Sequence, residues 1–393
     1  MTTTEAPTGT ELVRRLAERT DLFRKHALWQ EENRRIHDES IEALADAGVF
    51  KLRTPARYGG YESDARTLVD VGAELGRADG ALGWTASVYW VPTWMAGLFP
   101  DEAQDEVFAT PDARVCGTLS PSAMAAPVDG GMVVNGRWGF ISGAHHAHWQ
   151  EIITLSPTPD GGMQPLMALV PMSEVQIVDD WHTAGLRGSG SVTTVAKDLF
   201  VPQHRILPLG AVLQGQSASV LNAESLMYRT PLLAAANAAT VGPLIGLAKA
   251  AVEAFLERLP NRKITYTAYE SQLDAPITHL QVGEAALKAD QAEFHGHRIA
   301  ELVDRKAPAN EPWTLEERAR TRADVGAASQ LAKEAVGILA AASGGSSAYE
   351  DVPIQRIQRD VQVTGLHALI TTSTNLELYG RILCGLEPNT PFI

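Results

Sequence analysis

Residues 181–205, WHTAGLRGSGSVTTVAKDLFVPQHR, contain a glycine-rich turn followed by a strand-like run. Gly185, Gly188 and Gly190 lie within six positions, next to a cluster of serine and threonine hydroxyls. Glycines allow backbone N–H groups to approach an anion or a ring closely, and hydroxyls can donate hydrogen bonds to phosphate. The apolar, mostly β-branched residues that follow predict a half-buried strand, which Pro202 ends. Because an isolated glycine-rich loop is a weak signal, an ordinary hairpin in a β domain is an equally good interpretation at this point.

Length and composition limit the class of protein. The chain has 393 residues, more than one hydrophobic core usually supports, and its 45% hydrophobic and 20% charged residues are typical of globular proteins. The net charge of −14 argues against nucleic acid or an anionic membrane as the main partner. Cys116 and Cys384 are too few and too far apart for a disulfide framework or a cysteine-rich metal site. We find no secretory signal and no apolar run of membrane-spanning length, so we expect a cytoplasmic protein.

Helical periodicity dominates both ends of the chain. Apolar residues at helical spacing predict helices over 10–37, 38–47, 65–77 and 81–98 in the first third. The helix at 81–98 is apolar nearly all round and carries Trp84, Trp90 and Trp94, so it is either core or the wall of a flat hydrophobic pocket. Pro92 should kink or end it. Beyond residue 223, long Ala-rich stretches predict a four-helix bundle, with helices over 233–258, 278–305, 315–342 and 360–386.

Between these helical parts, residues 114–208 are rich in β-branched residues and turn signals. Asp129-Gly130-Gly131 and Asn135-Gly136 are typical of β-hairpins. We therefore expect an α+β protein that is mainly α, with three domains. They are an N-terminal α-helical domain over 1–112, a β domain over 113–215 and a C-terminal four-helix bundle over 216–393.

This order of domains resembles the acyl-CoA dehydrogenase fold, and five motifs along nearly the whole chain agree with it. They are GVFKLRTPARYGG (48–60), GRWGFISGAHHAHW (136–149), the glycine-rich segment 181–205, RKITYT (262–267) with Gln281 after it, and RDVQVTGLHALITTSTNLELYGRILCGL (359–386). The resemblance implies that the central domain is a β-barrel and that the protein is a homotetramer.

The sequence departs from the dehydrogenase pattern at positions that matter for the type of reaction. The common dehydrogenases carry a catalytic glutamate shortly after the Arg-Asp pair that Arg359 and Asp360 match, whereas this chain has His367 and Ala368 there. The stretch TLSPS (118–122) replaces the pattern Thr-Glu-Pro. The sequences GWTASVYWVPTW and HALITTSTNLELYGRILCGL are more similar to the two-component flavin-dependent monooxygenases that share this fold. That group includes the oxygenase component of 4-hydroxyphenylacetate hydroxylase and natural-product hydroxylases.

The second resemblance implies a monooxygenase. A separate NAD(P)H:flavin reductase would deliver reduced FAD or FMN, and O2 would add at flavin C4a to give a hydroperoxide. Its distal oxygen would hydroxylate a small aromatic molecule of the phenol or indole type, in natural-product biosynthesis or aromatic catabolism. The protein must then supply a pocket that excludes water, a hydrogen bond near flavin N5 and a group that positions or deprotonates the substrate.

The same resemblance implies site residues, with Ser142, His367 and Ser120 as the catalytic candidates. Ser142 matches the hydrogen-bonding residue at flavin N5, and His367 is the candidate for accepting a substrate proton or contacting the hydroperoxide. The cofactor-binding candidates are Trp138 near the ring, Ser122 in the segment that crosses flavin and substrate, and Ser191, Arg262 and Gln281, with Arg262 reaching the phosphates of a neighbouring subunit. The substrate-pocket candidates are Trp84, Trp90, Ser120, Arg229 and His367.

Each candidate also has an ordinary structural interpretation. Serines form turns, tryptophans and a lone histidine in an apolar helix pack in cores, and Arg262 fits a solvated helix end. The HHAH run (His145, His146 and His148) lacks a carboxylate partner, so we expect no metal there. Two other functions remain open: an acyl-CoA dehydrogenase-like flavin oxidoreductase, and a non-catalytic subunit with the flavin fold.

Overall fold

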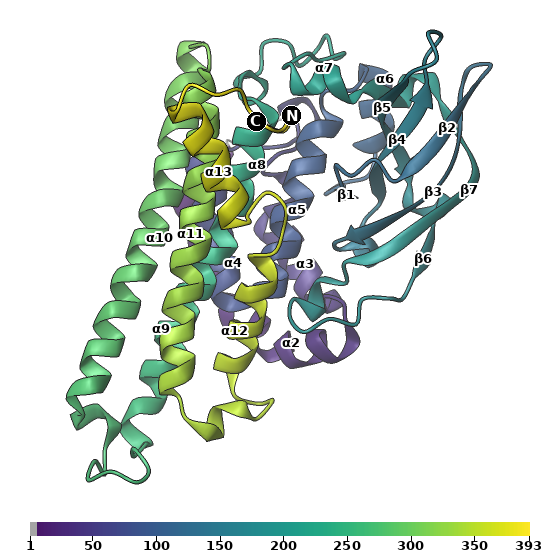
Figure 1. Ribbon diagram of the computed structural model, residues 1–393. Helices are drawn as coiled ribbons and strands as arrows, with labels where there is room; N and C mark the ends of the chain where they lie inside the picture. Colours follow the sequence, from purple (N-terminus) through teal and green to yellow (C-terminus); the bar gives the residue numbers. More distant parts are fainter. Residues whose placement is uncertain (1–5) are drawn as a thin grey trace.

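The computed structural model describes residues 6–393, apart from the side chain of Asn261, and has three parts (Figure 1). The first part is helical. Its helices are α1 (Gly9–Ala17), α2 (Thr20–Asn33), α3 (Asp38–Ala47), α4 (Ala65–Ala78), α5 (Gly80–Ala96) and α6 (Asp101–Val107). A sheet follows at the right of the view and long helices stand at the left, with α5 between them.

Several helices begin at side chains that cap their free N–H groups. The Thr8 hydroxyl accepts from Glu11 N before α1, and the Asp79 carboxylate accepts from Leu82 N before α5. Pro92 does not end α5, which continues to Ala96, so that part of the expectation is wrong. The helix is buried nearly all round, and its packing outweighs the backbone hydrogen bond that proline removes.

The sheet contains every strand in the described part of the chain. The strands are β1 (Val115–Gly117), β2 (Ala123–Val128), β3 (Gly131–Ile141), β4 (Trp149–Pro157), β5 (Met163–Pro171), β6 (Gln176–Val178), β7 (Val192–Pro202) and β8 (Ile206–Pro208). Their order is β6-β7-β3-β2-β4-β5-β8, with β1 pairing in parallel beside β4. The expected barrel is not closed: among the described strands β6 and β8 are the two ends of an open ladder, and each has only three residues to offer a partner.

One of the two predicted hairpins is present. Asp129 and Gly130 connect β2 to β3. The two strands pair directly from the turn, beginning with Val128 opposite Gly131. The prediction of a second hairpin at Asn135-Gly136 is wrong, because both residues lie inside β3. The ladder to β7 shifts register there, and Asn135 and Asp198 exchange hydrogen bonds across the irregularity (3.2 and 2.8 Å). The Asn-Gly pair therefore serves a bulge in a continuous strand.

The C-terminal part contains α7 (Leu209–Leu213), α8 (Leu232–Thr240), α9 (Gly242–Arg258), α10 (Pro276–Ala309), α11 (Leu315–Ala342), α12 (Pro353–Thr364) and α13 (Thr372–Leu383). Three helices that the sequence predicts as single, over 10–37, 233–258 and 360–386, are each two helices. Pro243, which cannot donate to a carbonyl of the preceding turn, sits at the start of α9 and separates it from α8. A turn around His367 separates α12 from α13.

Glycines bring α4, α5 and α9 unusually close together. A Cβ at Gly246 of α9 would overlap the carbonyl oxygen of Ala73 in α4, and one at Gly83 of α5 would lie 2.7 Å from Gly76 N. We call the contacts of Gly76, Gly83 and Gly246 the glycine seam. The seam fixes α5 against the bundle, so the position of Trp84 depends on it.

One stretch, Leu232–Arg258, is long and apolar enough to cross a membrane by length and composition. The expectation that the chain has no such run is therefore wrong. In the structure 72% of its apolar window is buried inside the protein, and the stretch is divided between α8 and α9. Burial in the core accounts for its composition.

Candidate active site

The glycine-rich segment forms a tight turn that leads into β7, as the sequence predicts. Leu186 and Gly190 adopt left-handed backbone conformations, with φ of 50° and 52°. Leucine is strained in this region, whereas glycine is not. The Leu186 N–H donates to Oδ1 of Asp360 at 2.6 Å, so the turn is held from α12.

Three serine hydroxyls form a buried chain at this turn, which we call the serine relay. Ser189 Oγ donates to the Leu186 carbonyl and lies 2.7 Å from Ser191 Oγ, which lies 2.7 Å from Ser142 Oγ. The exposed fractions of Ser189, Ser191 and Ser142 are 1, 4 and 7%. The relay joins two predicted site residues, Ser142 and Ser191, from motifs 49 positions apart.

Trp84 connects the relay to the bundle. Its indole N–H donates to Ser142 Oγ at 3.2 Å, and its ring meets the His367 ring edge-on, with centroids 5.0 Å apart. His367 is half-buried in the turn between α12 and α13. Burial, reinforced by the nearby guanidinium of Arg322, lowers the pKa of His367 to about 4, so the imidazole is neutral at pH 7.

Solvent reaches α5 beside Trp84. All residues of this helix are buried except Val88 and Val91, which share the Trp84 face at spacings of four and seven residues. Helix α5 itself lies between the sheet and the bundle (Figure 1). An indole, two partly exposed valines and a neutral imidazole therefore give α5 and the turn after α12 an apolar character next to the Ser142 hydroxyl.

Other predicted residues lie outside this cluster. The indole N–H of Trp138 donates to the Ile153 carbonyl and that of Trp90 to the Val49 carbonyl, both at 2.9 Å. Both rings are in the hydrophobic core. Ser120 and Ser122 lie exposed between β1 and β2, and Arg229 forms a loose ion pair with Glu224 at 3.8 Å.

Arg262 lies in the connection between α9 and α10. Its guanidinium rests against Gly344, beside Arg258, whose Nη2 donates to Ser346 Oγ at 3.3 Å. No carboxylate among the described residues lies within ion-pair distance of either arginine. Gln281 is half-buried near the start of α10.

Two of the three histidines of the HHAH run, His146 and His148, make hydrogen bonds within the chain. His146 Nε2 bonds the Ile36 carbonyl and His148 Nδ1 accepts from Arg114 N. A different group, His26, His37 and Glu39, brings its ligand atoms within 4.8 Å of one another. There His26 Nε2 bonds the Glu39 carboxylate at 2.7 Å, and His37 Nδ1 caps α3 by accepting from Glu39 N, so each of the three residues already makes a hydrogen bond within the group.

Sequence reasoning missed residues that support the site. Ser189 could have been found from the sequence, because it is one of the hydroxyl residues clustered in the glycine-rich segment. In the sequence, Asp360 stands out only as part of the Arg359-Asp360 pair that resembles the dehydrogenase motif. Arg322, which donates to Asn375 Oδ1 at 2.8 Å and to the Phe392 carbonyl at 2.6 Å, gives no sequence signal that separates it from the other arginines of its helix.

Comparison with known proteins agrees with this architecture. The sequence models for the N-terminal and the C-terminal domain of acyl-CoA dehydrogenase match residues 5–113 and 238–372. The oxygenase component of an FADH2-dependent resorcinol hydroxylase from Rhizobium sp. (strain MTP-10005) is 31% identical over 96% of this chain and 95% of its own. The chain belongs to the flavin-dependent monooxygenases with the acyl-CoA dehydrogenase fold.

Further relatives support the same assignment. The oxygenase component of p-hydroxyphenylacetate 3-hydroxylase from Acinetobacter baumannii is 28% identical over 98% of this chain and 92% of its own. Among solved structures, XiaF from Streptomyces sp., in complex with FADH2 and glycerol, superposes with a TM-score of 0.90 at 30% identity, covering 98% of this chain and 97% of that one. The HsaA monooxygenase from M. tuberculosis gives 0.91 at 28% identity, covering 98% and 100%.

Proposed function

We propose that this monooxygenase takes reduced FAD or FMN from a separate NAD(P)H:flavin reductase and uses O2 to hydroxylate a small aromatic molecule of the phenol or indole type. The observation that carries the proposal is the contact of Ser142, Trp84 and His367, where the serine relay meets an apolar helix face and a histidine. Relatives named as resorcinol and p-hydroxyphenylacetate hydroxylases support an aromatic substrate.

The residues of the cluster fit a reduced flavin. When bound, the flavin supplies the activation of O2, and the protein orients it and excludes water. Ser142 Oγ is held between the Trp84 N–H and Ser191 Oγ, so the chain itself fixes the orientation of the hydroxyl that would contact flavin N5. His367, neutral at pH 7, can accept a proton from a phenol or an indole N–H bound against Trp84.

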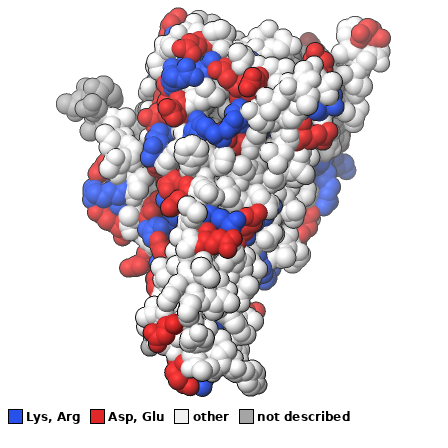
Figure 2. Space-filling model, turned by 60° about the vertical axis from the view of Figure 1, so that its left-hand side comes forward, with Lys and Arg blue, Asp and Glu red and all other residues white. Residues whose placement is uncertain are grey.

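We also propose a cytoplasmic homotetramer in which Arg262 of one subunit contacts the flavin phosphates of another. Two neighbouring arginines without a carboxylate partner among the described residues suit a phosphate. On α10 an exposed apolar stripe, formed by Ile277, Leu280, Leu287 and Phe294, is 56 to 74% exposed in the single chain. In Figure 2 the narrow lower part of the molecule is largely white above its charged tip. Burial of this stripe between subunits would remove it from water.

Rapid mixing tests the proposed function. Anaerobically reduced FAD or FMN is mixed with the protein and oxygenated buffer, and absorbance is followed with and without phenols and indoles. We expect a spectral species between reduced and oxidised flavin that outlives the one in free flavin. We expect Ser142→Ala to shorten its lifetime by about tenfold, the equivalent of one net hydrogen bond. Return to oxidised flavin at the free-flavin rate, without hydroxylated product, would contradict the proposal.

A further inference from the structure

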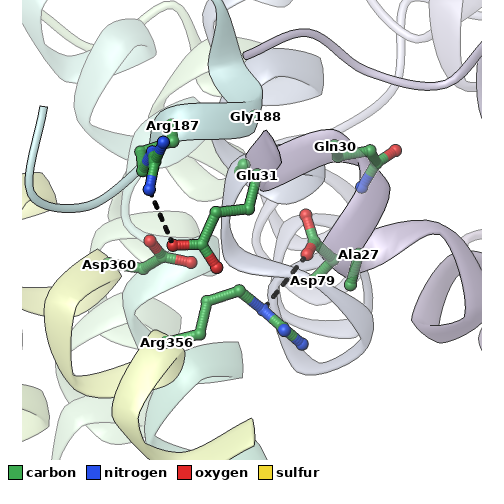
Figure 3. A pocket seen from close by; sticks show the side chains of 9 residues that line it. Ala27, Gln30, Glu31, Asp79, Arg187, Gly188, Arg356 and Asp360 are labelled. Atoms are coloured by element: carbon green, nitrogen blue, oxygen red, sulfur yellow. Dashed lines mark ion pairs between the residues drawn. The ribbon is translucent and has the colours of Figure 1, made fainter. Parts of the chain in front are cut away.

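A buried junction of charged side chains lies behind the serine relay, where α2, the start of α5, the glycine-rich turn and α12 meet (Figure 3). Three carboxylates are buried there: Glu31, Asp79 and Asp360 are 8, 5 and 3% exposed. Arg187 lies 3.8 Å from Glu31, and Arg356 lies 4.0 Å from Asp79. Burial of this much charge is unfavourable unless geometry and hydrogen bonds compensate it, so each bond at the junction is informative.

Helix α12 holds the glycine-rich turn at three successive residues. Arg359 Nη1 donates to the Ala184 carbonyl at 2.8 Å. A Cβ at Gly185 would overlap the Arg359 carbonyl, so the turn is pressed against the helix backbone. The Leu186 N–H then donates to Asp360 at 2.6 Å. This last bond is made by the residue whose backbone is strained.

From Leu186 a continuous series of bonds leads to the active site. The Leu186 carbonyl accepts from Ser189 Oγ at 2.7 Å, and Ser189, Ser191 and Ser142 follow in the relay. On the opposite side of Ser142, Trp84 belongs to α5, whose first turn is capped by Asp79. The two carboxylates therefore fix the two elements that orient the Ser142 hydroxyl.

We propose that Asp360 is a positioning residue of the monooxygenase: by holding Leu186 in its left-handed conformation, it sets the direction of Ser142 through the serine relay. The inference rests on the proposed function, because the direction of Ser142 matters only if a flavin lies beside it. An unpaired peptide N–H at Leu186 would leave the turn free to relax to an ordinary conformation. Ser189 would then lose the carbonyl that it donates to.

The test compares Asp360→Ala, which removes the acceptor, with Asp360→Asn, which keeps an acceptor oxygen at similar size. Ser189→Ala breaks the next link. Ser329→Ala is the matched control, because Ser329 is a buried serine of the bundle whose hydroxyl has no hydrogen-bond partner in the described part of the chain. In the flavin-free protein, we expect amide hydrogen exchange of residues 184–191 to rise about tenfold in Asp360→Ala, and much less in Asp360→Asn. Unchanged exchange in a folded Asp360→Ala protein would overturn the proposal.

The second readout is the lifetime of the oxygenated flavin species. Asp360→Ala and Ser189→Ala should each shorten it about tenfold, and the double variant should be no worse than either, because both break one chain. If the effects of the two substitutions multiply in the double variant, the inference is overturned. A wild-type lifetime in Ser189→Ala would also overturn it. The Ser189→Ala result decides the question even if the Asp360→Ala protein does not fold. If the wild-type protein shows no long-lived species, the proposed function fails, while the exchange result still decides whether Asp360 holds the turn.

Discussion

At the scale of single residues, His367 has the most unusual surroundings in the candidate site. It faces Trp84 and lies near the Arg322 guanidinium, and its folded-state pKa of about 4 is below that of an exposed histidine. Between pH 6.5 and 4 the unfolded chain binds the proton that the folded chain rejects. The contribution of His367 to stability is therefore complete above pH 6.5 and is lost as the pH falls toward 4.

We predict that His367→Asn flattens the pH dependence of the free energy of unfolding in this range, by up to ~3 kcal/mol. Denaturant unfolding at pH 4.5, 5.5 and 7 measures it. The exposed His279, changed to Asn, is the control and should leave the slope as in the wild type. A His367→Asn protein that still loses stability as steeply as the wild type would show that the imidazole is not held neutral by its surroundings.

Glu151 in β4 is fully buried, and neither carboxylate oxygen has a hydrogen-bond partner among the described residues. Burial raises its pKa well above the ordinary value for glutamate. The folded chain therefore holds a proton that the unfolded chain releases, and the contribution of Glu151 is lost as the pH rises above the unfolded pKa. We predict that Glu151→Gln gains stability relative to the wild type between pH 5 and pH 8, by about 1–3 kcal/mol at the upper end. Thermal unfolding of both proteins at pH 5 and pH 8 tests this. The same difference in melting temperature between the variant and the wild type at both pH values would refute it.

Part of the cluster could be expected from the family resemblance. The structure brings Ser142, Ser191, Trp84 and His367 together, and each is a candidate because its motif resembles one of the flavin-dependent monooxygenases. Trp90 shows the limit of such reasoning. Its indole N–H points to the Val49 carbonyl instead, and the direction of a ring on a helix that is apolar all round cannot be read from periodicity.

At the scale of elements, the glycine seam decides where α5 lies. We predict that Gly246→Ala destabilises the protein by ~3 kcal/mol or more, because its Cβ would overlap the backbone of α4 rather than a movable side chain. The matched control is Gly337→Ala on α11, where no atom lies within 4 Å of the added Cβ. It should be stabilising by about 0.5–1 kcal/mol through helix propensity. Equal effects of the two substitutions in chemical denaturation would show that the seam is not closely packed.

Most helices and strands are predictable at this scale, and the failures have local causes. The helices expected over 38–47 and 315–342 are α3 and α11, whose first turns are capped by the His37 side chain and by the Thr314–Glu317 capping box. The break at Pro243 was missed because the apolar pattern continues across it. Asn135-Gly136 was misread because the same dipeptide serves tight hairpins and bulges, and only the partner strand distinguishes them.

At the scale of the whole molecule, the α10 stripe is the surface on which the proposed tetramer can be tested. We predict that Leu287→Glu combined with Phe294→Glu lowers the oligomeric state, because two charges would enter an apolar interface. Sedimentation velocity measures this at several concentrations. Val220→Glu is the control, since Val220 is 77% exposed and lies away from α10 in the sequence. A wild-type monomer, or a double variant that sediments as the wild type does, would contradict the prediction.

The position of Arg258 and Arg262 at the end of the bundle predicts how two mutant chains behave when they are mixed. If each catalytic centre borrows its phosphate contacts from a neighbour, a defect in Ser142 and a defect in Arg262 damage different halves of the same shared centre. Two impaired proteins, Ser142→Ala and Arg262→Ala, should then complement each other when they are co-expressed or dissociated and reassembled together. In the hybrids, intact Ser142 from one parent meets intact Arg262 from the other, and activity rises above that of either parent without any wild-type chain being present.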